Sequence, residues 1–330
     1  MRRFGAVIKG TGSYLPQRCL SNADLEKLVD TNDDWIVQRT GIRERRLAET
    51  SESTSTMALK AARDALKAAH LTPEDLDLII VATLTPDMVT PSTACILQHQ
   101  LGIQRHIGAF DLGAACSGFV YALSVGSQFI GSGACKHVLV VGAETLSRLV
   151  DYTDRGTCIL FGDGAGAAVL SAHDDTSLGV QAFSLGADGG GGEFIHVPAG
   201  GSRTPASLET IASRQHYLKM NGREVYKFAV HQMTVSLEKA MLDCQLTAQQ
   251  VQLVIPHQSN VRIIDSATEK MGFPRDRVMV NIDRYGNTSA ASIPIALDEA
   301  MRTGRCGSGD WIILLAFGAG LTWASATIRL

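Results

Sequence analysis

The chain of 330 residues repeats itself, and this repeat limits the folds that it can adopt. The segment LTPEDLDLIIVATLT, which begins at Leu71, aligns with LTAQQVQLVIPHQSN, which begins at Leu246, at a shift of 175 residues. The segment FIGSGACKHVLVVGAE aligns with MRTGRCGSGDWIILLAFG, with Lys136 over Asp310, at a shift of 174 residues. Self-similarity at a fixed spacing is typical of a repeated structural unit, so two nearly equal shifts indicate a duplicated half.

A third pair of segments, at 109–130 and 281–302, has one shared pattern. Each segment is interpreted as a strand ending in Asp111 or Asp283, a turn of small residues, and a helix with apolar spacing. Apolar runs such as LIIVAT, VLVVGA and WIILLAF do not alternate with polar residues, which is typical of strands covered on both faces. The sequence therefore predicts a layered α/β/α/β/α sandwich with pseudo-twofold symmetry, in which the turns at Cys116 and Asn287 face each other.

Composition excludes several classes of protein. The chain is 45% hydrophobic and 19% charged, which suits a large α/β core, and its formal net charge of −3 lacks the basic footprint of a nucleic-acid binder. Seven scattered cysteines without CxxC spacing indicate neither a disulfide framework nor a metal site, and they favour a cytoplasmic location. The apolar run at 311–328 contains glycines and is interpreted as strand, turn and strand, so no membrane span is expected.

Three residues at predicted strand ends are candidates for chemistry. Cys116 precedes a helix, whose N-terminal dipole favours a thiolate; a small apolar core residue is the alternative. His257 in VIPHQSN and Asn287 in RYGNTS each have an ordinary structural interpretation when taken alone. Together, a thiol, an imidazole and a carboxamide form a plausible set for covalent catalysis, and the glycine-flanked AFGAG segment offers backbone N–H groups to an oxyanion.

The chain resembles the β-ketoacyl-acyl-carrier-protein synthase III family, the initiating condensing enzymes of type II fatty acid synthesis in the thiolase superfamily. The resemblance covers essentially the whole chain, through GTGSYLP, DTNDDWIVQRTGIRERR, ACSGFVYALS, DRGTCILFGDGAGAAVL, MNGREVYKFAV, PHQSNVRII, DRYGNTSAASIPIALDEA and AFGAGLTW. It implies a thiolase-like five-layer α/β/α/β/α sandwich of two duplicated halves, at 1–175 with the nucleophile and at 176–330 with the histidine and asparagine. It also implies decarboxylative Claisen condensation of an acyl-CoA primer, acetyl or longer, with malonyl-acyl-carrier protein through an acyl-cysteine.

The same resemblance implies roles for individual residues. Cys116 would be the acylated nucleophile, while His257 and Asn287 would hold the carbonyl of the malonyl thioester. The oxyanion hole would consist of the N–H groups of Cys116 and Ala319, the latter standing where many relatives have glycine. Phe317 resembles the aromatic residue that shields the cysteine pocket.

Binding residues follow from the resemblance in the same way. Trp35 and Arg155 resemble the pair that sandwiches the adenine of coenzyme A, Arg39 and Arg262 resemble its phosphate contacts, and Asn260 belongs to the same site. An indole face and guanidinium groups suit stacking and phosphate recognition.

The acidic carrier protein, which brings its substrate on a phosphopantetheine arm, is expected to meet a basic rim. Lys227, Arg262 and Lys270 resemble that rim, although Glu269 lowers the positive potential beside Lys270. Thr90 matches a position at the floor of the acyl pocket that relatives fill from the partner subunit of a homodimer, and threonine there leaves room for primers longer than acetyl.

No cofactor is expected beyond the coenzyme A thioester and the phosphopantetheine of the carrier protein. Three alternatives stay open at this point: a priming acyltransferase or condensing enzyme of a secondary-metabolite pathway, the inactive half of a heterodimeric synthase, and a chalcone-synthase-type enzyme. The intact Cys116, His257 and Asn287 disfavour the second, and AFGAG differs from the loop of the third. The glycines of FGDGAGA at 161–167 are interpreted as allowing close packing at a subunit interface, not as a phosphate loop.

Overall fold

Two sheets with the same strand order form the framework of the chain, whose computed structural model describes residues 3–330. In each sheet the first two pairings from one edge are antiparallel, and the remaining pairings are parallel. The first sheet has the order β1 (Gly5–Tyr14), β7 (Asp163–His173), β6 (His137–Thr145), β4 (Leu78–Ala82) and β5 (Gly108–Leu112). The second has the order β8 (Gly179–Ala187), β13 (Thr322–Arg329), β12 (Trp311–Gly318) and β11 (Val251–Pro256).

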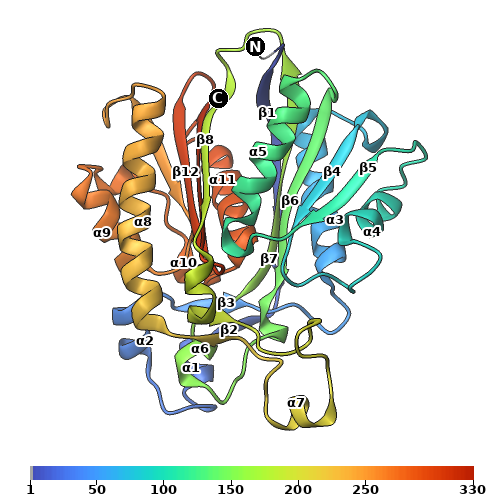
Figure 1. Cartoon of the computed structure of the whole chain (residues 1–330). Coiled ribbons are helices and arrows are strands. Elements are labelled where there is room, and N and C mark those ends of the chain that lie inside the picture. Colours follow the sequence, from blue (N-terminus) through green and yellow to red (C-terminus); the bar gives the residue numbers. More distant parts are fainter. Residues whose placement is uncertain (1–2) are drawn as a thin grey trace.

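Helices cover both faces of both sheets and produce five layers (Figure 1). The central layer contains α5 (Gly118–Gly131) and α11 (Ser292–Arg302), whose buried residues pack against strands of both sheets in one core. The outer face of the first sheet packs on α3 (Thr54–Ala69) and α4 (Thr93–Gln100). The outer face of the second packs on α8 (Gly222–Asp243) and α9 (Val261–Lys270). The predicted thiolase-like α/β/α/β/α sandwich is confirmed.

The strands of the first sheet show why apolar and polar residues do not alternate in this part of the sequence. Every residue of β4 and β6 is buried, because helices lie on both faces of the sheet. The glycine-interrupted run near the C-terminus forms β12 and β13 joined by a tight turn, as predicted.

Short elements gather at the lower end of the sandwich in Figure 1. Most of them contribute residues to a separate apolar core cluster that includes Leu25, Ile36, Phe161, Leu218 and Ile282. These elements are β2 (Cys19–Ser21), α1 (Asn22–Leu25), α2 (Asp33–Thr40), β3 (Glu44–Arg46), α6 (Arg155–Cys158), β9 (Ile195–His196), α7 (Leu208–Ala212), β10 (Lys219–Met220) and α10 (Ile282–Tyr285).

The predicted strand ending at Asp283 is wrong, because Asp283 lies in α10. The counterpart of β5 in the second half is reduced to an isolated parallel bridge between Val278 and Val254. Soon after this bridge the N–H of Asn281 donates to the side-chain oxygen of Gln258 at 2.9 Å, so the backbone leaves the sheet and turns into α10. The second sheet is therefore one strand shorter than the first.

The glycines of the FGDGAGA segment pack closely within the chain. A Cβ atom added at Gly162 would lie 2.3 Å from the carbonyl oxygen of Tyr285, and one added at Gly166 would lie 2.6 Å from the backbone nitrogen of Ile295. These two glycines let the start of β7 and the residue before it approach the second half closely within one chain. Packing of this segment at a subunit interface stays a prediction.

Candidate active site

Two matching turns bring the strand ends of the two halves together. Ala115 and Ser289 both have left-handed backbones, with φ of 47° and 49°, and each begins a 3₁₀ turn that leads into a central helix. Their numbers differ by 174, which equals the shift found in the sequence. Residues other than glycine rarely adopt this conformation, and it recurs at functional sites. The first of these turns places Cys116 at the entrance to α5.

Cys116 is buried, and its surroundings oppose ionisation. Burial raises the pKa of the thiol to about 12, a hydrogen bond with the Ser289 side chain lowers it, and the charge of Glu144 raises it further. Desolvation thus opposes the lowering of the pKa that is expected from the helix N-terminus.

His257 follows β11 and is held by the first residue of α11. Its Nδ1 lies 2.6 Å from Ser292 Oγ, and the backbone N–H of Gln258 donates to the same oxygen at 3.4 Å. The Ser292 hydroxyl can accept from Gln258 and at the same time donate to Nδ1, and in this arrangement the ring proton of His257 lies on Nε2. Burial lowers the pKa of the imidazole to about 3, so the ring is neutral at pH 7 and Nε2–H is a neutral donor.

Asn287 belongs to the second half but is fixed by the first. Its N–H donates to the carbonyl of Leu160 at 2.8 Å, and its carbonyl accepts from the N–H of Gly162 at 3.0 Å. The side-chain oxygen accepts from the N–H of Ser289 at 2.8 Å. Since that oxygen is occupied, the amide NH₂ is the end that remains for a ligand.

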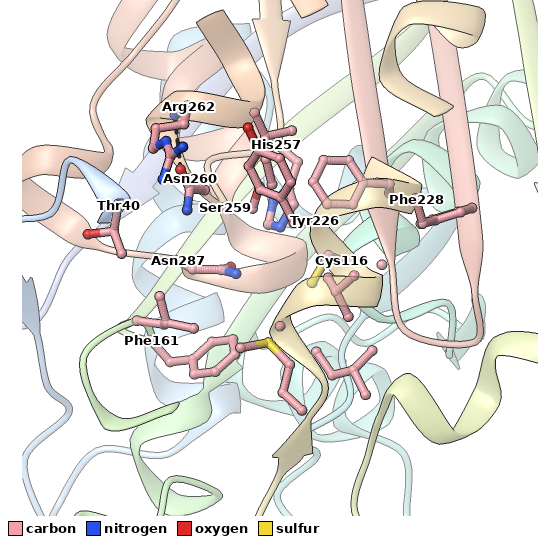
Figure 2. A pocket seen from close by; sticks show the side chains of 18 of the residues that line it. Thr40, Cys116, Phe161, Tyr226, Phe228, His257, Ser259, Asn260, Arg262 and Asn287 are labelled. Atoms are coloured by element: carbon pink, nitrogen blue, oxygen red, sulfur yellow. Dashed lines mark hydrogen bonds between the residues drawn. The ribbon is translucent and has the colours of Figure 1, made fainter. Parts of the chain in front are cut away.

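One cavity of about 450 Å³, called the main cavity below, is lined by Cys116, His257 and Asn287 together. In Figure 2 the three side chains point toward a common space, although they come from three separate turns. Phe317 also lines the main cavity and meets the His257 ring edge-on, with ring centroids 5.5 Å apart. The arrangement can combine a nucleophile with two neutral hydrogen-bond donors.

The backbone at Gly318 and Ala319 runs directly against Cys116. A Cβ atom at Gly318 would lie 2.8 Å from the backbone nitrogen of Cys116, so glycine is required for this approach. Ala319 lines the main cavity and does not have a positive φ, so alanine fits this position without backbone strain. The two N–H groups predicted to hold an oxyanion thus belong to neighbouring stretches of backbone.

Aromatic and basic side chains surround the mouth of the main cavity. The guanidinium carbons of Arg39 and Arg155 lie 4.6 Å and 5.0 Å from the centre of the Trp35 ring. Arg155 also donates to the carbonyl of Asp30 at 2.9 Å. Trp35 and Arg39 line the main cavity, and Arg155 lies beside them through its stacking on Trp35. An adenine between Trp35 and Arg155 would therefore have to replace their direct stacking.

Asn260 has a structural role in addition to its predicted binding role. Its side-chain oxygen caps α9 by accepting from the N–H of Arg262 at 2.9 Å, and its NH₂ donates to the carbonyl of Arg39 at 2.8 Å. Asn260 thereby joins α9 to α2 at the mouth of the main cavity, which it lines together with Arg262.

The predicted basic rim lies on α8 and α9, which pack side by side. Arg262 stacks on Tyr226 at 5.7 Å, and Arg223 joins it among the residues that line the main cavity. Lys227 pairs with Glu224 at 2.7 Å, which reduces its free charge, and Lys270 stands exposed in the last turn of α9. Among the basic side chains on α8 and α9 named here, Arg223 and Arg262 are thus the ones that line the main cavity.

A second cavity of about 320 Å³ begins on another side of Cys116. It is mostly apolar, and sequence reasoning missed almost all of its lining, because these residues come from loops distant in the chain. Its lining is Leu84, Ala115, Cys116, Leu146, Leu149, Phe161, Ile195, His196, Val197, Leu218, Ser289 and Ala319.

Thr90 lines neither the main cavity nor the second cavity. It is exposed next to Val89, whose side chain is 97% exposed. Within one chain, Thr90 is therefore not part of an acyl pocket.

Two kinds of feature are absent from residues 3–330. No three histidine, cysteine or acidic side chains are grouped so that they could hold a metal ion. Among the helices described, none combines the length and apolar character needed to cross a membrane.

The chain matches two sequence models of one family, 3-oxoacyl-[acyl-carrier-protein (ACP)] synthase III at residues 110–189 and its C-terminal region at residues 241–330. It is 52% identical over 327 residues to β-ketoacyl-acyl-carrier-protein synthase III of Caldanaerobacter subterraneus subsp. tengcongensis, covering 99% of this chain and 98% of that protein. The crystal structure of 3-oxoacyl-acyl-carrier-protein synthase III from Aquifex aeolicus VF5 superposes with a TM-score of 0.91 at 48% identity, covering 99% of this chain and 100% of that one. The priming β-ketosynthase of the R1128 polyketide pathway superposes with a TM-score of 0.92 at 36% identity, covering 100% and 97%.

Proposed function

The chain belongs to the β-ketoacyl-acyl-carrier-protein synthase III family, and on this premise we propose that Cys116, His257 and Asn287 carry out its two half-reactions. As a member of this family it is an acyltransferase that condenses an acyl-CoA primer with malonyl-acyl-carrier protein and so initiates fatty acid synthesis. The convergence of the three side chains in the main cavity is the observation that carries the assignment of roles.

In the first half-reaction the sulfur of Cys116 attacks the thioester carbon of acyl-CoA, and coenzyme A leaves. The negative charge on the tetrahedral oxygen is stabilised by the N–H groups of Cys116 and Ala319. Trp35, Arg39, Arg155, Asn260 and Arg262 would bind the coenzyme at the mouth of the main cavity, and its acyl chain would extend past Cys116 into the second cavity. No other cofactor is proposed.

In the second half-reaction malonyl-acyl-carrier protein reaches the main cavity by its phosphopantetheine arm, and its acidic surface meets Lys227, Arg262 and Lys270. Loss of CO2 places negative charge on the malonyl carbonyl oxygen. The neutral Nε2–H of His257 and the NH₂ of Asn287 stabilise that enolate as it forms. Its carbon then attacks the acyl group on Cys116.

Product analysis tests this proposal. The chain is incubated with acetyl-CoA and malonyl-acyl-carrier protein, and the carrier protein is weighed by intact mass spectrometry. A 3-ketoacyl mass on the carrier together with free coenzyme A is the expected result, and a malonyl mass that does not change would overturn it.

A priming enzyme of a secondary-metabolite pathway is the second candidate. It is supported by the high structural similarity to the priming β-ketosynthase of the R1128 polyketide pathway. Parallel product analyses with a fatty-acid carrier and a polyketide carrier separate the two, because the carrier that accepts the 3-ketoacyl group identifies the pathway.

Ser292→Ala is expected to lower malonyl decarboxylation about tenfold, because a hydrogen bond that fixes the proton of His257 on Nε2 is lost. Acylation by acyl-CoA should not change, since His257 acts in the second half-reaction. The measurement is acetyl-carrier protein formed from malonyl-carrier protein, with Ser292→Thr as the variant that restores the hydroxyl. Equal decarboxylation by Ser292→Ala and the parent chain would contradict this role.

Thr90→Phe is expected to lower turnover of C8 to C12 acyl-CoA about tenfold while acetyl-CoA turnover persists. The reason is a proposed homodimer, in which the exposed Thr90 of one subunit enters the second cavity of its partner. Steady-state assays across the chain lengths, with sedimentation to establish the dimer, check this. Unchanged use of long primers by Thr90→Phe would remove Thr90 from the acyl pocket.

A further inference from the structure

A buried carboxyl group lies behind the candidate nucleophile and has no place in the reaction described so far. Glu144 is at the end of β6 and is fully buried. Its carboxyl accepts hydrogen bonds from the Thr85 hydroxyl at 2.5 Å, the Thr83 hydroxyl at 3.2 Å, the N–H of Leu84 at 3.2 Å and the Ser289 hydroxyl at 3.2 Å. All four donors are neutral, so the charge of Glu144 has no ion-pair partner among these contacts.

The Ser289 hydroxyl stands between this carboxyl and Cys116. It donates to Glu144 Oε1 at 3.2 Å, and Ser289 lines the second cavity together with Cys116, whose own turn packs against the turn of Ser289. The left-handed backbone at Ser289 and the bond from its N–H to Asn287 fix the position of this turn. The series Cys116, Ser289 and Glu144 is called the proton chain below.

The other charged and titratable groups nearby are engaged elsewhere. His257 faces Cys116 across the main cavity and is neutral at pH 7. Asp87, on the loop after Thr85, accepts from Ser53 and Ser55 at the start of α3. His196, which lines the second cavity together with Cys116, lies with its Nε2 3.6 Å from the Glu193 carboxylate. Glu144 is therefore the candidate that remains for proton exchange with Cys116.

We propose that Cys116 and Glu144 share one proton through the Ser289 hydroxyl, and that Glu144 holds it while Cys116 carries the acyl group. On acylation the S–H bond breaks, Ser289 accepts that proton and passes its own to Glu144, and the sulfur lone pair forms the new C–S bond. Coenzyme A leaves as a thiolate and takes a proton from solvent. After condensation the sulfur leaves the tetrahedral intermediate as a thiolate and recovers the proton by the reverse route.

This inference rests on the proposed acyl-cysteine, but its first consequence does not require acyl-CoA. Burial raises the pKa of Glu144 to about 7 against the lowering effect of its hydrogen bonds. Below about pH 7, Cys116 and Glu144 together hold two protons, and the population of the Cys116 thiolate rises tenfold per pH unit. Above about pH 7, the two groups share one proton, so the thiolate population should become independent of pH.

The experiment measures alkylation of Cys116 by iodoacetamide from pH 5 to pH 9.5. The readout is the mass of the Cys116 peptide after digestion, because Cys19 and Cys95 are exposed and also react. The parent chain is expected to show a rate that rises and then levels near pH 7. Glu144→Gln keeps the size of the side chain but cannot take the proton, so its rate should continue to rise and exceed that of the parent chain about 100-fold at pH 9. A purely structural role for Glu144 would change the rates without changing the shape of the profile.

Two further variants make the test independent of how Glu144→Gln folds. Ser289→Ala should keep the levelling but lower the level about tenfold, because the hydroxyl that hydrogen-bonds to the thiolate is lost. Asp163→Asn is the matched control: Asp163 is another fully buried carboxyl group, bound by Ser147 and the N–H of Ala48, and its loss should leave the profile unchanged.

Parallel profiles for the parent chain and Glu144→Gln, or no effect of Ser289→Ala, would overturn the shared proton even if Cys116 accepts acyl groups. If the pH profiles of alkylation are as expected but acyl-CoA does not acylate Cys116, the proton chain is supported and the proposed acyl-cysteine is contradicted.

Discussion

Cys116→Ala is expected to abolish acyl transfer from acyl-CoA, with a loss of turnover of about 10⁴-fold or more, because Cys116 is the one thiol among the described residues that line the main cavity. The measurement is intact-protein mass after incubation with acyl-CoAs from C2 to C12. The parent chain should gain one acyl mass, and the chain lengths that label it would identify the primer.

Cys158→Ala is the matched control for this experiment. Cys158 is as deeply buried as Cys116 and lies in the same half of the chain, in α6, but it does not line either cavity. Its replacement should leave the acyl label in place. An acyl mass on Cys116→Ala would instead assign the nucleophile to a different residue.

The second large effect concerns the loss of CO2. His257→Ala and Asn287→Ala are each expected to lower decarboxylation of malonyl-carrier protein by about 10² to 10³-fold, because each removes one of the two donors to the developing enolate oxygen. Acylation of Cys116 should persist in both variants, since these donors act after the acyl group has been transferred. Acetyl-carrier protein formation and acyl-enzyme mass, measured on the same samples, separate the two half-reactions.

His137→Ala provides the comparison for His257→Ala. His137 is also buried and its Nδ1 also lies near a serine hydroxyl, that of Ser171 at 2.8 Å, but it lines neither cavity. Removing it imposes a similar loss of packing without removing a donor from the main cavity. If both histidine variants lost decarboxylation to the same extent, the effect would reflect folding and not enolate stabilisation.

The sequence predicted the layers and the position of the three side chains because the duplication is visible in it. His137 begins β6 and Trp311 begins β12, again 174 residues apart, and the matching turns follow the same spacing. The α10 turn was not predictable in this way, because the Gln258 side chain bonds to the backbone of both Met279 and Asn281. The local sequence pattern does not indicate that side-chain hydrogen bonds replace the pairing of a strand here.

The polar partners of the candidate site were missed for a related reason. Glu144, Ser289 and Ser292 each sit in stretches of apolar or small residues, where their sequence context favours a simple turn or cap. Their roles depend on contacts across the interface of the halves, such as that between Ser289 and Glu144, which are 145 residues apart. The second cavity was missed likewise, since its walls come from loops that no repeat relates.

The missing strand of the second half has an evolutionary reading. The first copy has five strands, whereas the second lacks the counterpart of β5. The segment that would form this strand leads instead to the first copy, where the backbones of Leu160 and Gly162 hydrogen-bond to Asn287. Two copies that stayed identical would have offered two similar turns and no amide beside the thiol. Divergence of one copy thus converted a symmetric fold into an asymmetric site, and substitutions at 160–162 and at 281–287 are expected to have been selected together.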